Sequence, residues 1–294
     1  MKKLIFLFLL ISSSSIFSQI NYSDSWEDFY SYNNVKDFVK VDAIIYALVD
    51  NAIFTFDENT LEIKKLSSIQ GLSGETTSSI HYNATFKRLI IGYENGLIEV
   101  IDENESVTIS SDIINFNQTG EKSINHISES GNTLYLSTPF AIVEYDIEKL
   151  EFGDTFFIGN GSTSLIINKT VISVFNNKLY VAEGSKLFQF NNGILTLVRD
   201  FFEPIIGLKS SNTNLTVALN KKAIVLGLSQ NELAEFTSNL EFDFTLLNAF
   251  YENNTIFLAT KEFGILKTSF AQINRYQEIH PEGPLSNDVF SIAV

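Results

Sequence analysis

The sequence is poor in the residues that usually carry catalysis or cross-linking. It has no cysteine, three histidines and one tryptophan in 294 residues. The absence of cysteine excludes disulfides, a thiol nucleophile and a lipid-modified signal peptide. His81, His126 and His280 are isolated, so no histidine pair has the spacing of metal ligands. A Gly-x-Ser-x-Gly nucleophile turn is also missing. We therefore assign no catalytic and no cofactor-binding residue, and leave a metal site open.

Basic residues are scarce as well. The chain has 20 Lys and Arg residues against 35 Asp and Glu residues. Nucleic-acid affinity comes largely from cationic contacts to phosphate, so this balance argues against a nucleic-acid partner. It argues equally against direct attraction to an anionic bilayer.

Long apolar runs are confined to the first residues of the chain. Met1-Lys2-Lys3 precedes the apolar stretch Leu4–Leu10, and a serine-rich segment follows it. This order is typical of a secretory signal peptide, and the stretch is too short to span a membrane. We expect cleavage after Ser18, export from the cytoplasm, and no transmembrane segment in the mature chain.

What the chain does contain is a pair of strands repeated six times. Each copy is an apolar β-rich run, a short polar or glycine-containing turn and a second apolar run. Successive copies begin 44, 45, 45, 36 and 41 residues apart. A period near forty with several short strands per unit is typical of propeller blades. The copies are Ile45–Phe56, Leu89–Ile101, Leu134–Tyr145, Leu179–Phe190, Leu215–Leu226 and Ile256–Lys267.

The second unit shows the plan of one blade. Ser79–Tyr82, Arg88–Gly92 and Leu97–Asp102 read as three strands, and Ser106–Ser110 supplies a fourth. Asn95-Gly96 suits a tight hairpin because both residues tolerate positive φ. The third unit repeats the plan, with strands expected at Ile124–Ser128, Thr133–Ser137, Ile142–Asp146 and Asp154–Ile158. One such unit buries too little apolar surface to fold alone, so blades must pack on one another in a ring.

The sequence therefore predicts an all-β fold, a β-propeller of about six to seven four-stranded blades whose last blade could be incomplete. We expect a signal peptide at residues 1–18 and a single propeller domain at residues 19–294. Residues 21–36, which include Trp26, are expected to form a strand that docks on a neighbouring blade. His280–Val294 reads as the opening of another repeat, so the chain is expected to be the N-terminal part of a longer protein.

Three groups of side chains have both a structural and a functional interpretation. His81 and His126 lie on predicted inner strands, and we favour hydrogen-bonded histidines at the channel wall over ligands. Asp50, Glu94 and Glu183 recur at turns; we favour solvated turn residues over a site for a cation or sugar hydroxyls. Tyr93, Tyr135 and Tyr180 could stack on sugars if exposed. Tyr135 and Tyr180 share the same position within a strand, so for these two we favour packing between blades.

The sequence resembles a known family. Gly71-Leu72-Ser73 followed by Ser79-Ile80 and Leu89–Gly92 resembles the blade consensus of two-component-regulator propellers, and Gly283–Val289 repeats its opening. A more specific series resembles the N-terminal propeller of PorZ proteins, found in Bacteroidetes that use the type IX secretion system. The series comprises Trp26-Glu27-Asp28, Ser31–Asp37, Gly71-Leu72-Ser73, Ile91–Gly96 and Lys122–Ile127.

The resemblance implies a function that composition alone does not give. PorZ proteins act at the outer-membrane surface with a sortase-like protease, a barrel protein and a linking subunit, which attach cargo to anionic lipopolysaccharide. It implies a non-enzymatic component in the periplasm or on the outer-membrane surface of a Gram-negative bacterium, with these proteins and lipopolysaccharide as partners. Two alternatives stay open: the oligosaccharide-binding sensor of a hybrid two-component regulator, and a carbohydrate-active propeller enzyme. We do not assign partner-binding loops from the sequence.

Overall fold

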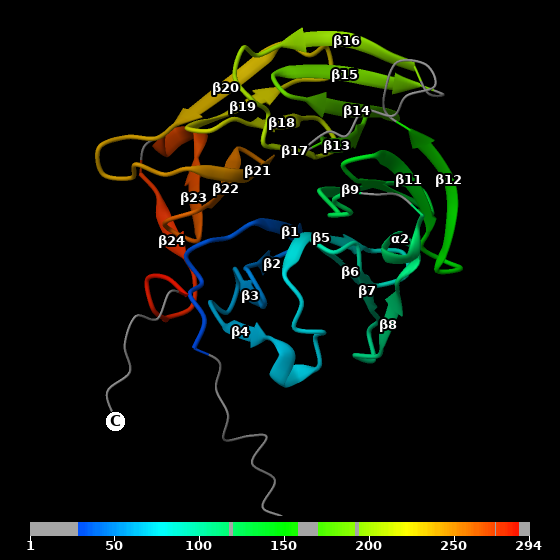
Figure 1. Ribbon diagram of the computed structural model, residues 1–294. Coiled ribbons are helices and arrows are strands. Elements are labelled where there is room, and N and C mark those ends of the chain that lie inside the picture. The colour runs from blue at the N-terminus through cyan, green and yellow to red at the C-terminus, as the bar shows by residue number, and fades with distance from the viewer. Residues whose placement is uncertain (1–28, 118–119, 158–169, 192–193, 274, 288–294) are drawn as a thin grey trace, which may run out of the picture.

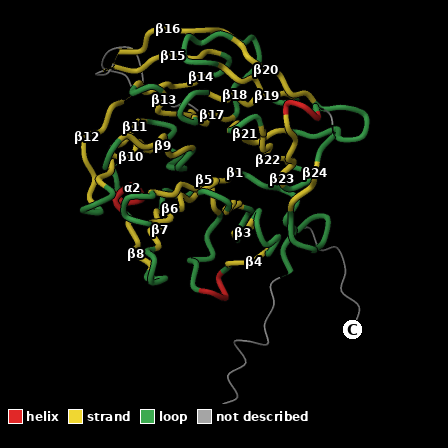
Figure 2. Tube along the Cα trace, turned by 180° about the vertical axis from the view of Figure 1, so that it is seen from behind, coloured by secondary structure: helices red, strands yellow, loops and turns green. Residues whose placement is uncertain are grey.

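A computed structural model describes residues 29–117, 120–157, 170–191, 194–273 and 275–287. The predicted signal peptide and Trp26 lie outside the described residues. Within them the fold is almost entirely β, as Figure 2 shows, and only three short helical turns occur. These turns are η3 (Ser68–Gln70), α2 (Asp112–Asn115) and η4 (Phe270–Gln272).

The described strands form six antiparallel four-stranded sheets, each built from strands consecutive in sequence. This confirms the predicted propeller, at the lower of the two expected blade numbers. The first blade comprises β1 (Asp37–Val41), β2 (Ile44–Leu48), β3 (Ile53–Asp57) and β4 (Ile63–Leu66). The second comprises β5 (Thr77–Asn83), β6 (Arg88–Tyr93), β7 (Ile98–Ile101) and β8 (Val107–Ser110). The third comprises β9 (His126–Ser130), β10 (Thr133–Ser137), β11 (Ala141–Asp146) and β12 (Glu151–Phe157).

The other three blades follow the same order. The fourth blade comprises β13 (Thr170–Phe175), β14 (Lys178–Glu183), β15 (Lys186–Asn191) and β16 (Ile194–Asp200). The fifth comprises β17 (Gly207–Ser210), β18 (Leu215–Ala218), β19 (Lys222–Leu226) and β20 (Glu232–Thr237). The sixth comprises β21 (Leu246–Glu252), β22 (Thr255–Thr260), β23 (Ile265–Ser269) and β24 (Gln277–Ile279). Figure 1 shows the first strand of each blade near the centre of the ring and the fourth strand at its rim.

The repeated sequence corresponds to the second and third strands of each blade. Many of these strands, such as β6 and β18, are buried on both faces, which explains their nearly continuous apolar residues. The turn at Asn95-Gly96 forms as the dipeptide predicts: Gly96 has φ of 90° and its N–H donates to the carbonyl of Tyr93 at 3.1 Å. The fourth strands are largely exposed, and β20 alternates between exposed and buried positions.

Each pair of neighbouring blades shares one cluster of buried apolar side chains, so six clusters surround the channel. The smallest lies between the third and fourth blades and has four buried members among the described residues: Ile142, Ile172, Leu179 and Val181. The one between the first and sixth blades closes the ring and includes Phe38, Phe54 and Phe257.

Ring closure does not use a strand from the N-terminal segment. No strand forms in residues 29–36, contrary to our expectation for the described part of that segment. The segment still docks on the sixth blade through two backbone hydrogen bonds. The N–H of Val35 donates to the carbonyl of Thr260 at 2.9 Å, and the N–H of Gly264 donates to the carbonyl of Asn33 at 2.7 Å. Residues 280–287 form no strand either. They lie against residues 30–33, where the N–H of Ser31 donates to Asn287 Oδ1 at 2.6 Å.

Candidate functional site

A buried polar network crosses the central channel. Asp37 of β1 accepts hydrogen bonds from the N–H of Ile80 at 3.1 Å and from Asn248 Nδ2 at 2.8 Å. Lys209 Nζ, from β17 of the fifth blade, lies 3.0 Å from Asp37 Oδ1. His126 Nε2 of β9 lies 3.1 Å from Asn248 Nδ2. The network therefore joins inner strands of five blades.

The charge at Asp37 is stabilised in spite of its burial. Burial alone would raise the pKa of this carboxyl, but the positive charge of Lys209, the neighbouring His126 and the backbone donor of Ile80 lower it overall. Asp37 is therefore an anion over the physiological range. A paired, fully hydrogen-bonded buried carboxylate of this kind fixes the geometry of the elements around it.

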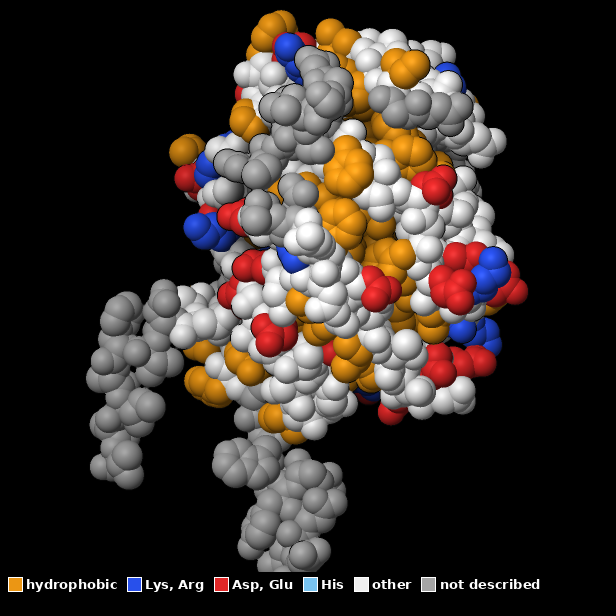
Figure 3. Space-filling view, turned by 45° about the vertical axis from the view of Figure 1, so that its right-hand side comes forward, with side chains coloured by type: hydrophobic (Ala, Val, Ile, Leu, Met, Phe, Trp, Pro, Cys, Tyr) orange, Lys and Arg blue, Asp and Glu red, His pale blue; other side chains and the backbone are white. Residues whose placement is uncertain are grey.

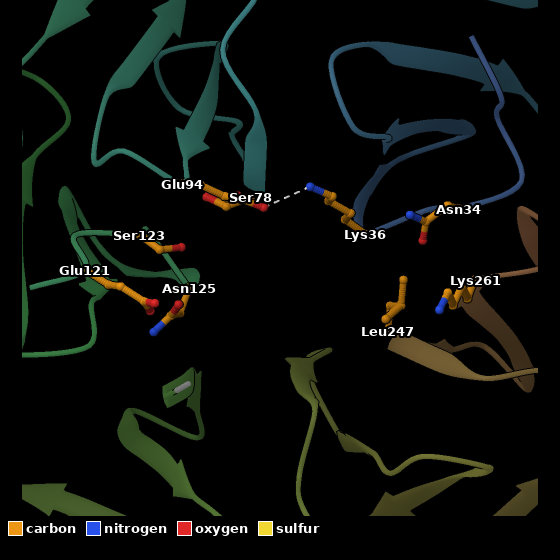
Figure 4. A pocket seen from close by; sticks show the side chains of 9 residues that line it. All are labelled: Asn34, Lys36, Ser78, Glu94, Glu121, Ser123, Asn125, Leu247 and Lys261. Atoms are coloured by element: carbon orange, nitrogen blue, oxygen red, sulfur yellow. Dashed lines mark hydrogen bonds and ion pairs between the residues drawn. The ribbon is translucent and has the colours of Figure 1, made fainter. Parts of the chain in front are cut away.

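The network separates two cavities. One, the channel mouth, has a volume of about 590 Å³ and lies where the inner strands begin. The other has a volume of about 150 Å³ and lies along the later residues of those strands, around Lys40, His81 and Lys209. The network thus lies between the two cavities, and Lys209 belongs both to the network and to the wall of the smaller cavity. The mouth is lined by Asn34, Lys36, Ser78, Glu94, Glu121, Ser123, Asn125, Leu247 and Lys261 (Figure 4).

Two of the recurring turn carboxylates meet at this mouth. Lys36 Nζ lies 3.1 Å from Asp50 Oδ1 and 3.1 Å from Glu94 Oε1. The third, Glu183, ends β14 in the fourth blade and makes no contact with Lys36. Because Lys36 already has two anionic partners, the three side chains tie the first and second blades together at the rim of the mouth.

Other side chains at the mouth retain unused hydrogen-bonding capacity. Among the described residues Lys261 has no ion pair, and the buried Nδ2 of Asn125 has no hydrogen-bond acceptor. Figure 4 shows Glu121, Ser123 and Asn125 on one side of the cavity and Leu247 and Lys261 on the other. A polar lining with both charges on opposite walls suits a ligand held by hydrogen bonds.

The two channel histidines behave as the structural interpretation expects. His81 Nε2 lies 2.9 Å from Glu129 Oε2, and Asn83 Nδ2 donates to the same oxygen at 2.8 Å. Burial opposes ionisation of Glu129, but these two donors lower its pKa overall. His126 is buried within the network. His280 lies away from both, where Nδ1 donates to the carbonyl of Pro281.

The three tyrosines differ in their surroundings. Tyr93 is buried, and its hydroxyl donates to Glu99, which together with burial raises the tyrosine pKa. Tyr180 is buried against Phe175, and its hydroxyl accepts from Gln230 Nε2 at 2.9 Å. The packing between blades predicted for Tyr180 is therefore confirmed. Tyr135 is half-buried: it packs against the core between the third and fourth blades, as predicted, and also lines a groove there.

Sequence reasoning missed Asp37, Lys209 and Asn248. Each is a polar residue inside or beside an apolar inner strand, and that is the one signal the sequence offers. Which of these residues meet depends on ring closure. Within the described part of the chain, no three His, Asp or Glu side chains form a group that could hold a metal. No described helix has the length and apolarity to cross a membrane.

Solved structures with the same fold come from diverse proteins. A structure of PorZ from Porphyromonas gingivalis, described as an essential bacterial surface component of the type IX secretion system, is 19% identical with a TM-score of 0.63. The alignment covers 90% of this chain but 41% of that one. The extracellular domain of a putative hybrid two-component system from B. thetaiotaomicron is 15% identical with a TM-score of 0.55, over 81% of this chain and 34% of that one.

A computationally designed protein, Ika8, matches with a TM-score of 0.51 at 10% identity, over 87% of this chain and 89% of its own. These identities show a shared propeller fold. No match was found among curated protein sequences.

A family model gives the more specific result. The model of the PorZ N-terminal β-propeller domain of the type IX secretion system matches residues 45–193, which is half of the chain. The matched region runs from β2 to the end of β15 and includes the channel residues Glu94, Asn125 and His126. The chain therefore belongs to the PorZ N-terminal β-propeller family.

Proposed function

We propose that this protein is a non-enzymatic surface component of a type IX secretion system, and that it acts in cargo attachment by binding other proteins of a sortase-like outer-membrane complex. Anionic lipopolysaccharide is its proposed second ligand. Family membership over residues 45–193 carries the proposal. The P. gingivalis relative, described as a surface component of that system, supports it.

The proposal includes an exported location, at the periplasm or the outer-membrane surface, with residues 1–18 as the signal peptide and residues 19–294 as one domain. The mechanism would be display on a rigid disc. Six interblade cores and the network around Asp37 hold the loops of both faces in fixed positions. The mouth offers Lys261 and Asn125 as free donors for a bound chain or glycan.

A second function has one structural observation in its favour. The neighbour from B. thetaiotaomicron belongs to a putative hybrid two-component system, and its extracellular domain shares this fold. An oligosaccharide-sensing role would use the same mouth, since hydroxyl and amide side chains line it.

The two functions are separated by affinity capture from outer membranes of the source bacterium. The tagged full chain should retain a sortase-like protease and an outer-membrane barrel subunit, identified by mass spectrometry. Two variants form a matched pair. Lys261→Ala removes a lysine that lines the channel mouth, and the control Lys87→Ala removes an exposed lysine that does not line it. Failure to capture either subunit, together with tight binding of soluble oligosaccharide, would replace the secretion role with the sensor role.

A further inference from the structure

The groove between the third and fourth blades has a volume of about 310 Å³. It lies beside the interblade core that has the fewest buried members among the described residues. Tyr135, Phe156 and Phe190 contribute aromatic rings to its wall, and Phe156 and Phe190 pack edge to face with centroids 5.4 Å apart. The other lining residues are Glu144, Asn177, Lys178, Leu179, Gln189 and Asn191.

Glu144 is the unusual member of this set. It is half-buried, yet it forms no ion pair and accepts no hydrogen bond among the described residues. Several half-buried carboxylates elsewhere are paired: Glu58 contacts Lys40 and Lys267, and Glu129 contacts His81. Glu183 resembles Glu144 in having no side-chain partner among the described residues, but it does not line this groove. Removing a carboxylate partly from water is unfavourable unless a cation or donors replace the water. Lys178 lines the same groove, but among the described residues no cation lies within ion-pair distance of Glu144.

The aromatic rings extend that preference. Tyr135 and Glu144 are directly paired across β10 and β11, so the ring and the carboxylate share one wall. Burial and the nearby charge of Glu144 raise the pKa of the Tyr135 hydroxyl. A carboxylate beside aromatic rings suits a cation on a long apolar stem. The stem packs on the rings, and the charge interacts with both the carboxylate and the ring faces.

The rim of the groove suits a polypeptide. Asn177, Gln189 and Asn191 supply amide donors and acceptors that can pair with an extended backbone. Leu197 of β16 is 54% exposed and lies on the same face of the strand as Leu195, which packs in this interblade cluster. Figure 3 brings forward the side of the molecule on which Figure 1 places β11 and β12, and apolar side chains gather across that face.

We propose that the groove between blades three and four anchors an Arg or Lys side chain from an extended segment of a protein partner, with Glu144 pairing with its charge. The proposal rests on the protein-binding part of the proposed function. The formal net charge of −15 attracts basic segments over long range. Lys178 is exposed at the edge of the groove. Its charge is therefore solvated and screened, and it repels the incoming Arg or Lys side chain only weakly.

A peptide titration tests the anchor directly. The probe is the capped peptide Gly-Ala-Arg-Ala-Gly, compared with its citrulline analogue, which keeps the shape and loses the charge. Both are titrated into the isotopically labelled full chain and followed by amide NMR. The Arg peptide should shift resonances of residues 177–179 and 189–191 and bind about tenfold more tightly than the citrulline peptide.

Two variants make the test specific. Glu144→Gln should weaken binding of the Arg peptide about tenfold and leave the citrulline peptide unchanged, whereas Glu183→Gln, at another half-buried carboxylate, should leave both unchanged. Thermal unfolding checks that each variant is folded. Equal binding of the two peptides, shifts elsewhere on the chain, or a Glu144→Gln variant with full affinity would overturn the anchor. Methyl glucoside shifting the same resonances while the Arg peptide does not would also overturn it, in favour of a glycan site.

Repeating the outer-membrane capture with Glu144→Gln separates this inference from the proposed function. Loss of a subunit that the wild-type chain retains supports the anchor. Equal retention of the subunits by both chains leaves the secretion role intact and removes the anchor.

Discussion

Lys209 and Asp37 form an ion pair across the centre of the propeller, 3.0 Å apart, from strands separated by 172 residues. Both side chains are nearly buried, with 13% and 4% exposed. We expect Lys209→Met to destabilise the protein by about 3–5 kcal/mol, because it leaves the carboxylate buried without its counter-ion. Urea unfolding measures the change. In Asp37→Asn/Lys209→Met the cost should fall well below the sum of the two single changes; an additive result would contradict the pairing.

The same pair predicts how stability depends on pH. The folded-state pKa of Asp37 lies below its ordinary value of 3.8. Its contribution is therefore complete above the unfolded-state pKa and is lost as pH falls through the folded-state pKa, and Glu129, whose pKa is also lowered, acts in the same direction. The free energy of unfolding, measured from pH 7 down to pH 3, should decrease. Asp37→Asn should show a shallower decrease, and a parallel curve would argue against this assignment.

Ring closure depends on the core between the first and sixth blades. Phe257 of β22 is 2% exposed, and the ammonium groups of Lys40 and Lys267 lie 5.9 and 5.7 Å from its ring centroid. We expect Phe257→Ala to cost about 3–5 kcal/mol, since it opens a cavity at the closing interface. Phe202 is 88% exposed, and its replacement by Ala should change stability by about 0.5 kcal/mol or less. Chemical unfolding of both variants distinguishes a closed ring from an open stack of blades. In an open stack, Phe257→Ala would lower the free energy of unfolding only slightly.

The hairpin glycine at position 96 has two reasons to be glycine. Its φ is 90°, and a Cβ there would lie 2.9 Å from the carbonyl oxygen of Lys122 and 2.9 Å from Ile113 Cγ2. Gly131 also has positive φ, at 62°, but a Cβ there meets nothing within 4 Å. Gly131→Ala should therefore cost about 1 kcal/mol, and Gly96→Ala clearly more. Thermal unfolding of the two variants checks the order, and equal costs would show that the contact with Lys122 is relieved cheaply.

Local sequence determined the blades well. The hairpin copies, the Asn95-Gly96 turn and the strand plan of the second and third units all correspond to observed strands, because alternation, β-branched residues and turn chemistry act over a few residues. The structure of the N-terminal segment was harder to predict from the sequence. Residues 29–36 dock on the sixth blade by single hydrogen bonds instead of as a strand, and no short-range pattern encodes that contact.

The sequence by itself determined a ring of like sheets, since each repeat has two apolar faces that only neighbouring repeats can cover. The tertiary structure alone decided the number of blades that closes the ring and what meets at its centre. Asp37, His126, Lys209 and Asn248 are distant along the chain, and ring closure brings them within hydrogen-bonding distance. The same holds for Glu144 and Phe190, which line one groove only because the third and fourth blades pack side by side.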